Sequence, residues 1–212
     1  TRQPENTRSF AIAAHGGAGK TSLVEAMLFD NGSTTRLGKV VDGNTASDFS
    51  QEEQKRQISI NTSLVTMERN GRQFFVLDTP GFADFIGEMR SAVRVADALL
   101  IAVSGVSGIE VQTDKAWETG SEFELPTAFY VSKLDRENSD FGKVLEDLRS
   151  VYSDKAVAVF LPVGSEASFN GVVDILKNMA YIYETDGSGK FTESDVPADM
   201  ADAAAQARES LV

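Results

Sequence analysis

The residues from Ala14 to Thr21 form a glycine-rich turn, Ala14-His15-Gly16-Gly17-Ala18-Gly19-Lys20-Thr21, between an apolar run and a helical pattern. Such a turn binds phosphate, because its backbone N–H groups and the positive end of the following helix dipole face the anion. Lys20 brings a compact positive charge to the β- and γ-phosphate oxygens, and the Thr21 hydroxyl can take one octahedral position on Mg²⁺. The usual pattern begins with glycine, where this chain has Ala14. An ordinary helix N-terminus is the alternative reading.

A second candidate, Asp78-Thr79-Pro80-Gly81, ends a predicted strand and leads into a helix. The Asp78 carboxylate would face the phosphates from a neighbouring strand end and hold Mg²⁺ through water. Gly81 has no Cβ, so its N–H can approach a γ-phosphate and let the next helix distinguish a triphosphate from a diphosphate. A structural turn is the alternative.

A third candidate, Ser132-Lys133-Leu134-Asp135, follows an apolar run and is similar to the N-K-x-D motif that recognises guanine. The Asp135 carboxylate can accept hydrogen bonds from guanine N1 and N2, whereas adenine offers no such pair of donors. The stem of Lys133 would lie along the base plane. Three motifs in this order, each at a strand end, predict that the chain binds GTP and GDP.

These motifs require a sheet whose strand ends share one edge. The predicted strands are Ser9 to Ala14, Ile58 to Glu68, Gln73 to Asp78, Ala98 to Val103 and Thr127 to Val131. The predicted helices are Lys20 to Phe29, Phe82 to Val95, Gln112 to Gly120 and Phe141 to Tyr152. The expected fold class is α/β, a P-loop GTPase domain with a mostly parallel twisted sheet, helices on both faces and one antiparallel edge hairpin at Asn70-Gly71.

Two stretches depart from this regular pattern. From Asp30 to Gln57 the sequence is polar and without a sustained period, which predicts a long mobile segment of the kind that is usually functional. From about residue 157 the chain predicts short strands, a hairpin around Asp186-Gly187-Ser188-Gly189 and a last helix from Ala198 to Leu211. The stripe Met200, Ala204, Ala207 and Leu211 should pack that helix on the hairpin.

Composition excludes several classes of function. The 212 residues carry a net charge of −12 and no cysteine. Diffuse attraction to nucleic acid is therefore absent, DNA is not an expected partner, and any RNA contact must be local. The longest apolar run, residues 98–103, is far shorter than the roughly 18 residues of a membrane span. We therefore expect no membrane contact, a cytoplasmic location and a monomer.

The chain resembles the N-terminal part of the elongation factor G family, the ribosomal translocases and their paralogues, nearly from end to end. Beyond the three motifs, the resemblance rests on further segments: Asp48-Phe49, Arg56-Gln57-Ile58-Ser59-Ile60, Gly108-Ile109-Glu110-Val111-Gln112, Pro162-Val163-Gly164-Ser165-Glu166, Phe169-Asn170-Gly171-Val172-Val173-Asp174 and Asp195-Val196-Pro197-Ala198-Asp199-Met200. It implies a GTP-binding core over residues 1–156. Residues 157–212 would be the start of an inserted α+β subdomain, with the chain ending before the family's domain is complete.

The resemblance also implies a GTPase that uses GTP, GDP and Mg²⁺. Its partners would be the ribosome, at the sarcin-ricin loop of the large-subunit RNA, and the stalk proteins. The residues expected at the nucleotide are Ala14, His15, Gly16, Gly17, Ala18, Gly19, Lys20, Thr21, Asp78, Thr79, Pro80, Gly81, Phe82, Ser132, Lys133 and Asp135. The expected Mg²⁺ ligands are Thr21, Ser59 and Asp78.

Several positions differ from the family. Phe82 stands where the family has the histidine that orients the attacking water. No residue can then be assigned as the catalytic base, and Lys20 and Gly81 are left to stabilise charge. Losing such a proton-handling group costs about 10²–10⁴ in rate, so we expect slow or absent hydrolysis with nucleotide binding intact. The histidine in the phosphate loop, His15, is expected to pack or cap there.

Three smaller differences concern binding. Ser59 replaces a threonine but keeps the hydroxyl that can bind Mg²⁺. Ser132 replaces an asparagine, and its shorter side chain predicts weaker guanine binding. Gly17 replaces an aspartate and removes one negative charge near the phosphates.

The sequence is compatible with two functions, and a third is less favoured. The chain is either the GTP-hydrolysing domain of a translocase-like factor or a GTP-gated ribosome-binding module with little or no hydrolysis, and Phe82 separates the two. A small GTPase unrelated to translation is the third possibility. The sequence does not distinguish translocation from recycling or rescue.

Overall fold

The computed structural model describes residues 4–184, 186 and 188–211. Contacts divide the chain into two compact units, one of residues 4–103 with 110–132 and one of residues 104–109 with 133–211. The functional division expected after residue 156 stays a prediction. Gly187 of the predicted hairpin turn lies outside the described residues.

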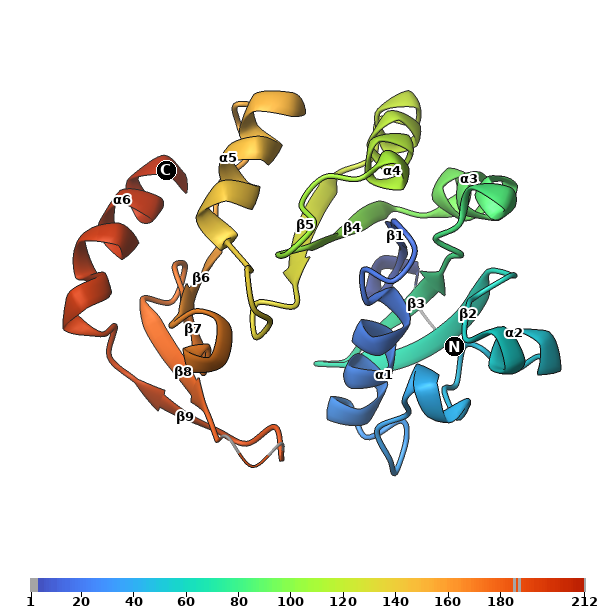
Figure 1. Cartoon of the computed structure of the whole chain (residues 1–212), viewed down its shortest axis with the longest axis horizontal. Helices are drawn as coiled ribbons and strands as arrows, with labels where there is room; N and C mark the ends of the chain where they lie inside the picture. Colours follow the sequence, from blue (N-terminus) through green and yellow to red (C-terminus); the bar gives the residue numbers. More distant parts are fainter. Residues whose placement is uncertain (1–3, 185, 187, 212) are drawn as a thin grey trace. The chain divides into compact units, whose positions relative to one another are not determined.

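The first unit is built on a five-stranded sheet with the order β2-β3-β1-β4-β5 (Figure 1). Its strands are β1 (Thr7–Ala14), β2 (Ser63–Arg69), β3 (Arg72–Asp78), β4 (Ala98–Ser104) and β5 (Thr127–Ser132). β1 pairs in parallel with both β3 and β4, and β2 pairs antiparallel with β3. The β2–β3 turn has positive φ at Asn70 (53°) and Gly71 (72°), so the predicted edge hairpin is confirmed.

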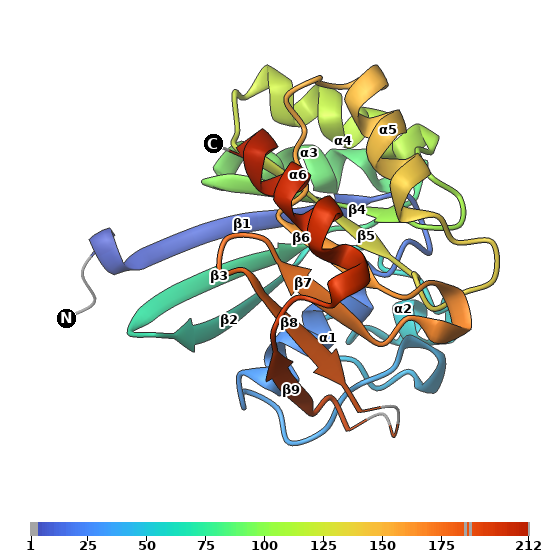
Figure 2. The same cartoon turned by 90° about the vertical axis from the view of Figure 1, so that its left-hand side faces the viewer.

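Helices cover both faces of this sheet. They are α1 (Lys20–Asp30), the short α2 (Gln51–Arg56), α3 (Ile86–Val95) and α4 (Val111–Glu122). Figure 2 shows α1 on one side of the sheet and α3 and α4 on the other. Ile12, Val24, Leu28 and Val76 form a buried cluster between α1 and the sheet. The α/β fold class with a mostly parallel sheet is confirmed.

The structure differs from the sequence prediction between residues 40 and 62. The segment expected to lack regular structure contains a 3₁₀ turn at Val40–Asp42 and helix α2. The strand expected to begin at Ile58 begins at Ser63 instead. The N–H groups of Ile60 and Asn61 donate to the carboxylate of Glu53 rather than to a neighbouring strand. The Glu53 side chain is therefore the hydrogen-bond acceptor for amides that were expected to pair with a strand. The hydropathy pattern gives no sign of such a side-chain acceptor.

The second unit contains helix α5 (Phe141–Val151) and an antiparallel sheet with the order β6-β7-β8-β9. Its strands are β6 (Phe160–Val163), β7 (Gly171–Asp174), β8 (Met179–Tyr183) and β9 (Phe191–Ser194). The last helix, α6 (Ala201–Leu211), buries Ala204 against Val173, Ile175 and Ala180. The predicted stripe is thus the packing face of the last helix, but of the predicted hairpin only β8 takes part in this cluster, together with the neighbouring strand β7. In the described part of the chain, no helix combines the length and the apolar composition needed to cross a bilayer.

Ile175 and Leu176 offer a matched test of this second core. Ile175 is 2% exposed and Leu176 is 65% exposed, although they are neighbours in the chain. We expect Ile175→Ala to lower the free energy of unfolding by about 2–5 kcal/mol, because it leaves a cavity under α6. Leu176→Ala should change it by less than about 0.5 kcal/mol. Urea denaturation followed by circular dichroism measures both, and equal effects would contradict the packing.

Candidate nucleotide-binding site

The glycine-rich turn predicted to bind phosphate, called the phosphate loop below, connects the end of β1 to the start of α1. Gly17 and Gly19 adopt φ values of 78° and 94°, a backbone region that residues with a Cβ rarely enter. The turn is closed by the Ala18 N–H, which donates to the His15 carbonyl at 3.2 Å. Lys20 is only 5% exposed, and its Nζ lies 3.4 Å from the same carbonyl oxygen. The predicted loop and its lysine therefore form one compact turn.

Thr21, Ser59 and Asp78 meet beside Lys20, although they come from three separate segments. The Thr21 Oγ1 atom donates to Asp78 Oδ2 at 3.0 Å and lies 3.2 Å from Ser59 Oγ. The parallel pairing of β1 with β3 places Asp78 opposite Ile12, close to the start of the loop. The structure thus brings together the three side chains predicted as Mg²⁺ ligands.

These side chains are suitable for Mg²⁺. Asp78 is 1% exposed, and its Oδ1 atom makes no hydrogen bond within the described part of the chain. Mg²⁺ prefers hard oxygen donors and commonly takes only one or two carboxylates, with water and phosphate oxygens completing its shell. No group of three or more acidic, histidine or cysteine side chains that could hold a metal occurs among the described residues. A metal here would depend on Asp78, two hydroxyls and the phosphates.

Asp48 is a site residue that the sequence analysis did not assign. It is 5% exposed, accepts a hydrogen bond from Ser59 and faces Lys20. Burial raises the pKa of its carboxyl, with Glu53 and Glu25 adding to the increase and Ser59 and Lys20 opposing it. The sequence offered Asp48-Phe49 as one segment of the family resemblance, but it gave Asp48 no role at the site. Its placement depends on tertiary contacts.

Burial also shifts the two central charged groups. It lowers the pKa of Lys20, against the opposing charges of Asp78 and Asp48. It raises the pKa of Asp78 to about 6, while the nearby Ser47 hydroxyl, Lys20 and Thr21 act in the opposite direction. Each group is therefore less readily charged than in water. An additional cation next to Asp78 would stabilise its ionised form.

The segment after β3, residues 79–82, passes close to the glycine-rich turn. The Thr79 hydroxyl donates to the Ile12 carbonyl at 2.7 Å, and Pro80 is buried. A Cβ on Gly81 would lie 2.9 Å from the Gly16 nitrogen and would also collide with Lys20 Nζ. Glycine at position 81 is therefore required by the close approach of two backbones.

The Phe82 ring packs on the phosphate loop. A Cβ added to Gly16 would lie 3.0–3.2 Å from three atoms of this ring, so the aromatic face rests where Gly16 has no side chain. Phe82 remains 42% exposed. The ring carries no atom that accepts a proton, and the role expected for residue 82 stays a prediction.

His15 and Ser132 contact the rim of the loop. The His15 Nε2 atom lies 3.6 Å from Glu110 Oε1, and its Nδ1 atom is buried without a hydrogen bond in the described part of the chain. The Ser132 hydroxyl donates to the Ala18 carbonyl at 2.7 Å and lies 3.3 Å from the Val103 carbonyl. Ser132 therefore keeps a contact with the phosphate loop despite its short side chain. Weaker guanine binding stays a prediction.

Lys133 and Asp135 belong to the second unit. Lys133 adopts a positive φ of 59°, and Asp135 is exposed with its Oδ2 atom 3.6 Å from Arg136 Nε. The predicted convergence of these residues with Lys20 and Asp78 stays a prediction.

Comparisons with known proteins agree on one relationship. The sequence pattern of the elongation factor Tu GTP binding domain matches residues 5–198. Elongation factor G of Rhodopseudomonas palustris (strain BisB18) is 35% identical over 209 residues, which are 98% of this chain and 30% of that protein. A crystal structure of a protein from Thermus thermophilus superposes with a TM-score of 0.89 at 34% identity, covering 96% of this chain and 30% of that one. The chain thus spans about 30% of the length of these relatives.

The raised pKa of Asp78 predicts an unusual dependence of stability on pH. Because the folded pKa, about 6, exceeds the ordinary value of 3.8, the folded state binds more protons between these values. In metal-free protein, the wild type should therefore lose on the order of 2–3 kcal/mol relative to Asp78→Asn as pH rises from about 4 to 7. Urea denaturation of both proteins in EDTA measures this difference, and parallel pH profiles would contradict it.

Proposed function

The chain belongs to the elongation factor Tu GTP-binding domain family of translational GTPases, and we propose that it binds GTP and GDP with Mg²⁺ and couples nucleotide state to interaction with the ribosome. The observation that carries this proposal is the meeting of Thr21, Ser59 and Asp78 beside the buried Lys20. Burying this set of groups is costly without a ligand, which supports a binding role.

Each group has a defined task in the proposed complex. Lys20 and the N–H groups of the glycine-rich turn would bind the β- and γ-phosphates. Thr21, Ser59 and Asp78 would hold Mg²⁺, which when bound neutralises phosphate charge. Gly81 packs close to the Gly16 nitrogen, which supports a role in which its backbone N–H would contact a γ-phosphate bound at the loop. This arrangement lets the segment after β3 respond to the loss of that phosphate.

Guanine specificity is assigned to Asp135, with Lys133 beside the base. Ser132 supports this assignment, because its hydroxyl ties the end of β5 to the phosphate loop through the Ala18 carbonyl. Asp135 lies three residues after Ser132, the last residue of β5.

Hydrolysis is proposed to be slow. GTP hydrolysis is general in this family, but Phe82 replaces the expected water-orienting group, and His15 is occupied with Glu110 at the rim of the loop. A module in which GTP gates ribosome binding, with hydrolysis dispensable, is therefore the second candidate. The packing of the Phe82 ring on Gly16 favours it, because that position is filled by carbon atoms.

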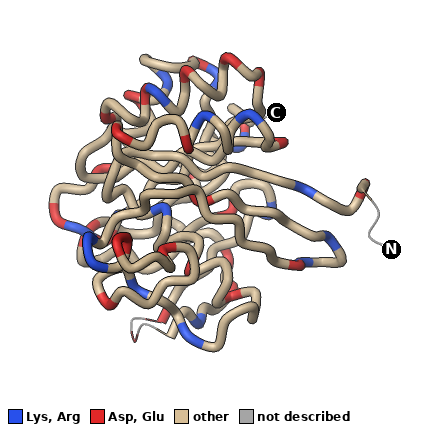
Figure 3. Tube along the Cα trace, turned by 90° about the vertical axis from the view of Figure 1, so that its right-hand side faces the viewer, with Lys and Arg blue, Asp and Glu red and all other residues tan. Residues whose placement is uncertain are grey.

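The proposed partner is the ribosome, at the sarcin-ricin loop and the stalk proteins, with the chain acting as a monomer in the cytoplasm. The proposal follows from the relationship to elongation factor G. Figure 3 shows Lys and Arg positions scattered among Asp and Glu along the trace, and the net charge is −12. Contacts with RNA would therefore be local rather than driven by overall charge.

Replacing Asp135 tests the base contact. We expect Asp135→Asn to weaken GTP binding by about 10²-fold, because two hydrogen bonds to a charged acceptor are lost. Inosine triphosphate lacks the N2 amino group, so the preference of the wild type for GTP over it should disappear in the variant. Fluorescence titration measures both ligands, with the exposed Asp199→Asn as control. An unchanged preference for GTP would rule out this role of Asp135.

Replacing Phe82 separates the two candidate functions. We expect Phe82→His to cleave bound GTP about 10²-fold faster than the wild type, because imidazole can accept a proton at this position. Phe82→Leu removes the ring without supplying such a group and should give no acceleration. Single-turnover GTP cleavage, with and without ribosomes, measures all three proteins. Equal and fast rates in the wild type and Phe82→His would refute the proposal of slow hydrolysis.

A further inference from the structure

Glu53 is a buried carboxylate that lies outside the motifs of the nucleotide site. It is 1% exposed, on helix α2. Its Oε1 atom accepts the N–H groups of Ile60 at 3.0 Å and Asn61 at 3.1 Å, and its Oε2 atom accepts the Ser50 N–H at 3.1 Å. The Glu53 carboxylate thus accepts hydrogen bonds from three backbone amides, one from the residue before α2 and two from residues after it.

The turn from Gln57 to Asn61 is built on this carboxylate. Gln57 ends α2 with a left-handed φ of 56°, which reverses the chain direction, and β2 starts only at Ser63. The amides of Ile60 and Asn61 therefore receive from Glu53 the acceptors that a neighbouring strand would otherwise supply. Ser59 lies in the middle of this turn, 3.2 Å from Thr21.

The charge of Glu53 is stabilised in place. Burial alone would raise the pKa of its carboxyl, but hydrogen bonds from Ser50, Ile60 and Asn61 outweigh burial and lower the pKa below its ordinary value. An ionised acceptor gives stronger hydrogen bonds than a neutral one. Charge-assisted hydrogen bonds therefore contribute to holding the turn, alongside the backbone bond from Ile58 N–H to the Glu53 carbonyl.

We propose that Glu53 is a positioning residue for the metal side of the site, because its carboxylate fixes the Gln57–Asn61 turn so that the Ser59 hydroxyl reaches Thr21. The inference rests on the proposed function, since Ser59 matters only if the site holds Mg²⁺ with GTP. Glu53 is not assigned as a metal ligand, because its two oxygens accept backbone amides. It lowers the cost of bringing Ser59 to the ion, because the turn is ordered beforehand.

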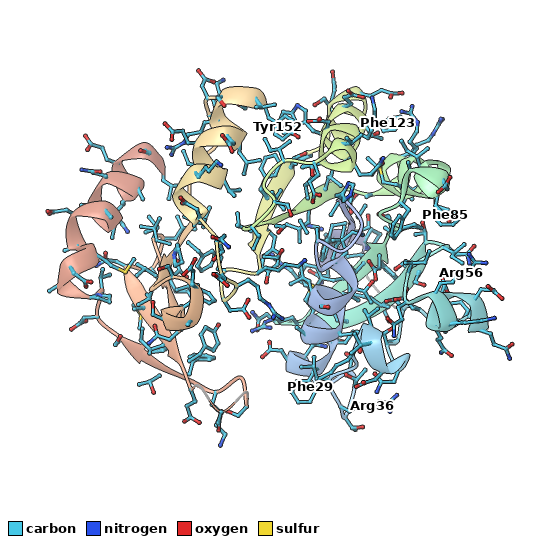
Figure 4. All side chains as sticks on the ribbon, in the orientation of Figure 1. Phe29, Arg36, Arg56, Phe85, Phe123 and Tyr152 are labelled. Carbon is cyan, nitrogen blue, oxygen red and sulfur yellow. The ribbon has the colours of Figure 1, made fainter. Side chains whose placement is uncertain are left out.

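Two other glutamates supply matched controls. Glu25 on α1 is 2% exposed and accepts the amides of Gly38 and Ala46, so it orders the earlier part of the same segment without touching the Ser59 turn. Glu52 neighbours Glu53 on α2 but is exposed, and it pairs with Arg56, which is labelled in Figure 4. Glu25→Gln measures the effect of losing a buried carboxylate that binds Gly38 and Ala46 instead of the Ser59 turn. Glu52→Gln measures the effect of removing one negative charge from α2.

The first measurement is amide hydrogen exchange of the nucleotide-free chain. In Glu53→Gln, an amide N–H₂ replaces one acceptor oxygen, and backbone donors lose a charged partner. We expect exchange in residues 58–62 to become about tenfold faster or more, while β1 and β4 keep their protection. Glu52→Gln should match the wild type. Unchanged exchange in Glu53→Gln would overturn the proposal.

The second measurement is binding of a non-hydrolysable GTP analogue as Mg²⁺ is titrated. We expect Glu53→Gln to need about tenfold more Mg²⁺ for half-maximal binding, while its affinity in EDTA stays within about twofold of the wild type. Glu25→Gln should show a smaller Mg²⁺ shift at a similar loss of thermal stability. Faster exchange without a Mg²⁺ shift, or an equal shift in Glu25→Gln, would show that Glu53 is only structural and would overturn the proposal.

The two proposals fail in different ways. A wild-type chain that binds no GTP analogue at any Mg²⁺ concentration refutes the proposed function and the metal role of Glu53 together. Normal binding by the wild type with identical Mg²⁺ dependence in Glu53→Gln refutes the positioning role alone. If Glu53→Gln lacks a cooperative melting transition, Glu53→Asp keeps the charge on a shorter stem. Intermediate shifts in both measurements are then expected, and their absence overturns the proposal.

Discussion

The burial of Lys20 is the constraint on which the first unit depends. A lysine at 5% exposure requires compensating groups, and the structure supplies Asp78 and Asp48, both buried as well. Asp78 can reach it because β3 runs parallel to β1 and ends at the same edge. Asp48 can reach it only because the segment between α1 and β2 folds back over the site. The sheet and the irregular segment are thus joined through one cluster of charges.

Much of this arrangement could be predicted from the sequence, where local chemistry and periodicity decide. The sequence predicted three features: the glycine-rich turn with Lys20, the hairpin at Asn70-Gly71 and the apolar stripe of α6. Positive φ values favour glycine and asparagine, and a packed helix places apolar residues at a period of about 3.6. The resemblance to elongation factor G added Ser59 to the site, which spacing alone would not have done.

The rest could not be predicted, because it depends on tertiary hydrogen bonds to buried carboxylates. Ile58 to Thr62 resembles the start of a strand, yet Glu53 supplies the acceptors for Ile60 and Asn61. Asp48 and Ser132 also have partners that the sequence pattern does not reveal. Asp48 is buried, and the Ser132 hydroxyl donates to the Ala18 carbonyl. Such partners have no periodic signature, because side-chain hydrogen bonds follow neither the helix period nor the strand period, whether the partner is seven residues away, as for Glu53 and Ile60, or far along the chain, as for Ser132 and Ala18.

The Asp78 Oδ1 atom makes no hydrogen bond within the described part of the chain, and this should affect the melting temperature of the protein. Burial of the Asp78 carboxylate near Asp48 lowers the free energy of unfolding of the ligand-free protein. Binding of a cation with phosphate would raise it again. The melting temperature of this chain should therefore report whether the groups around Asp78 hold a ligand, so a thermal-shift screen can rank candidate ligands without an assay of turnover.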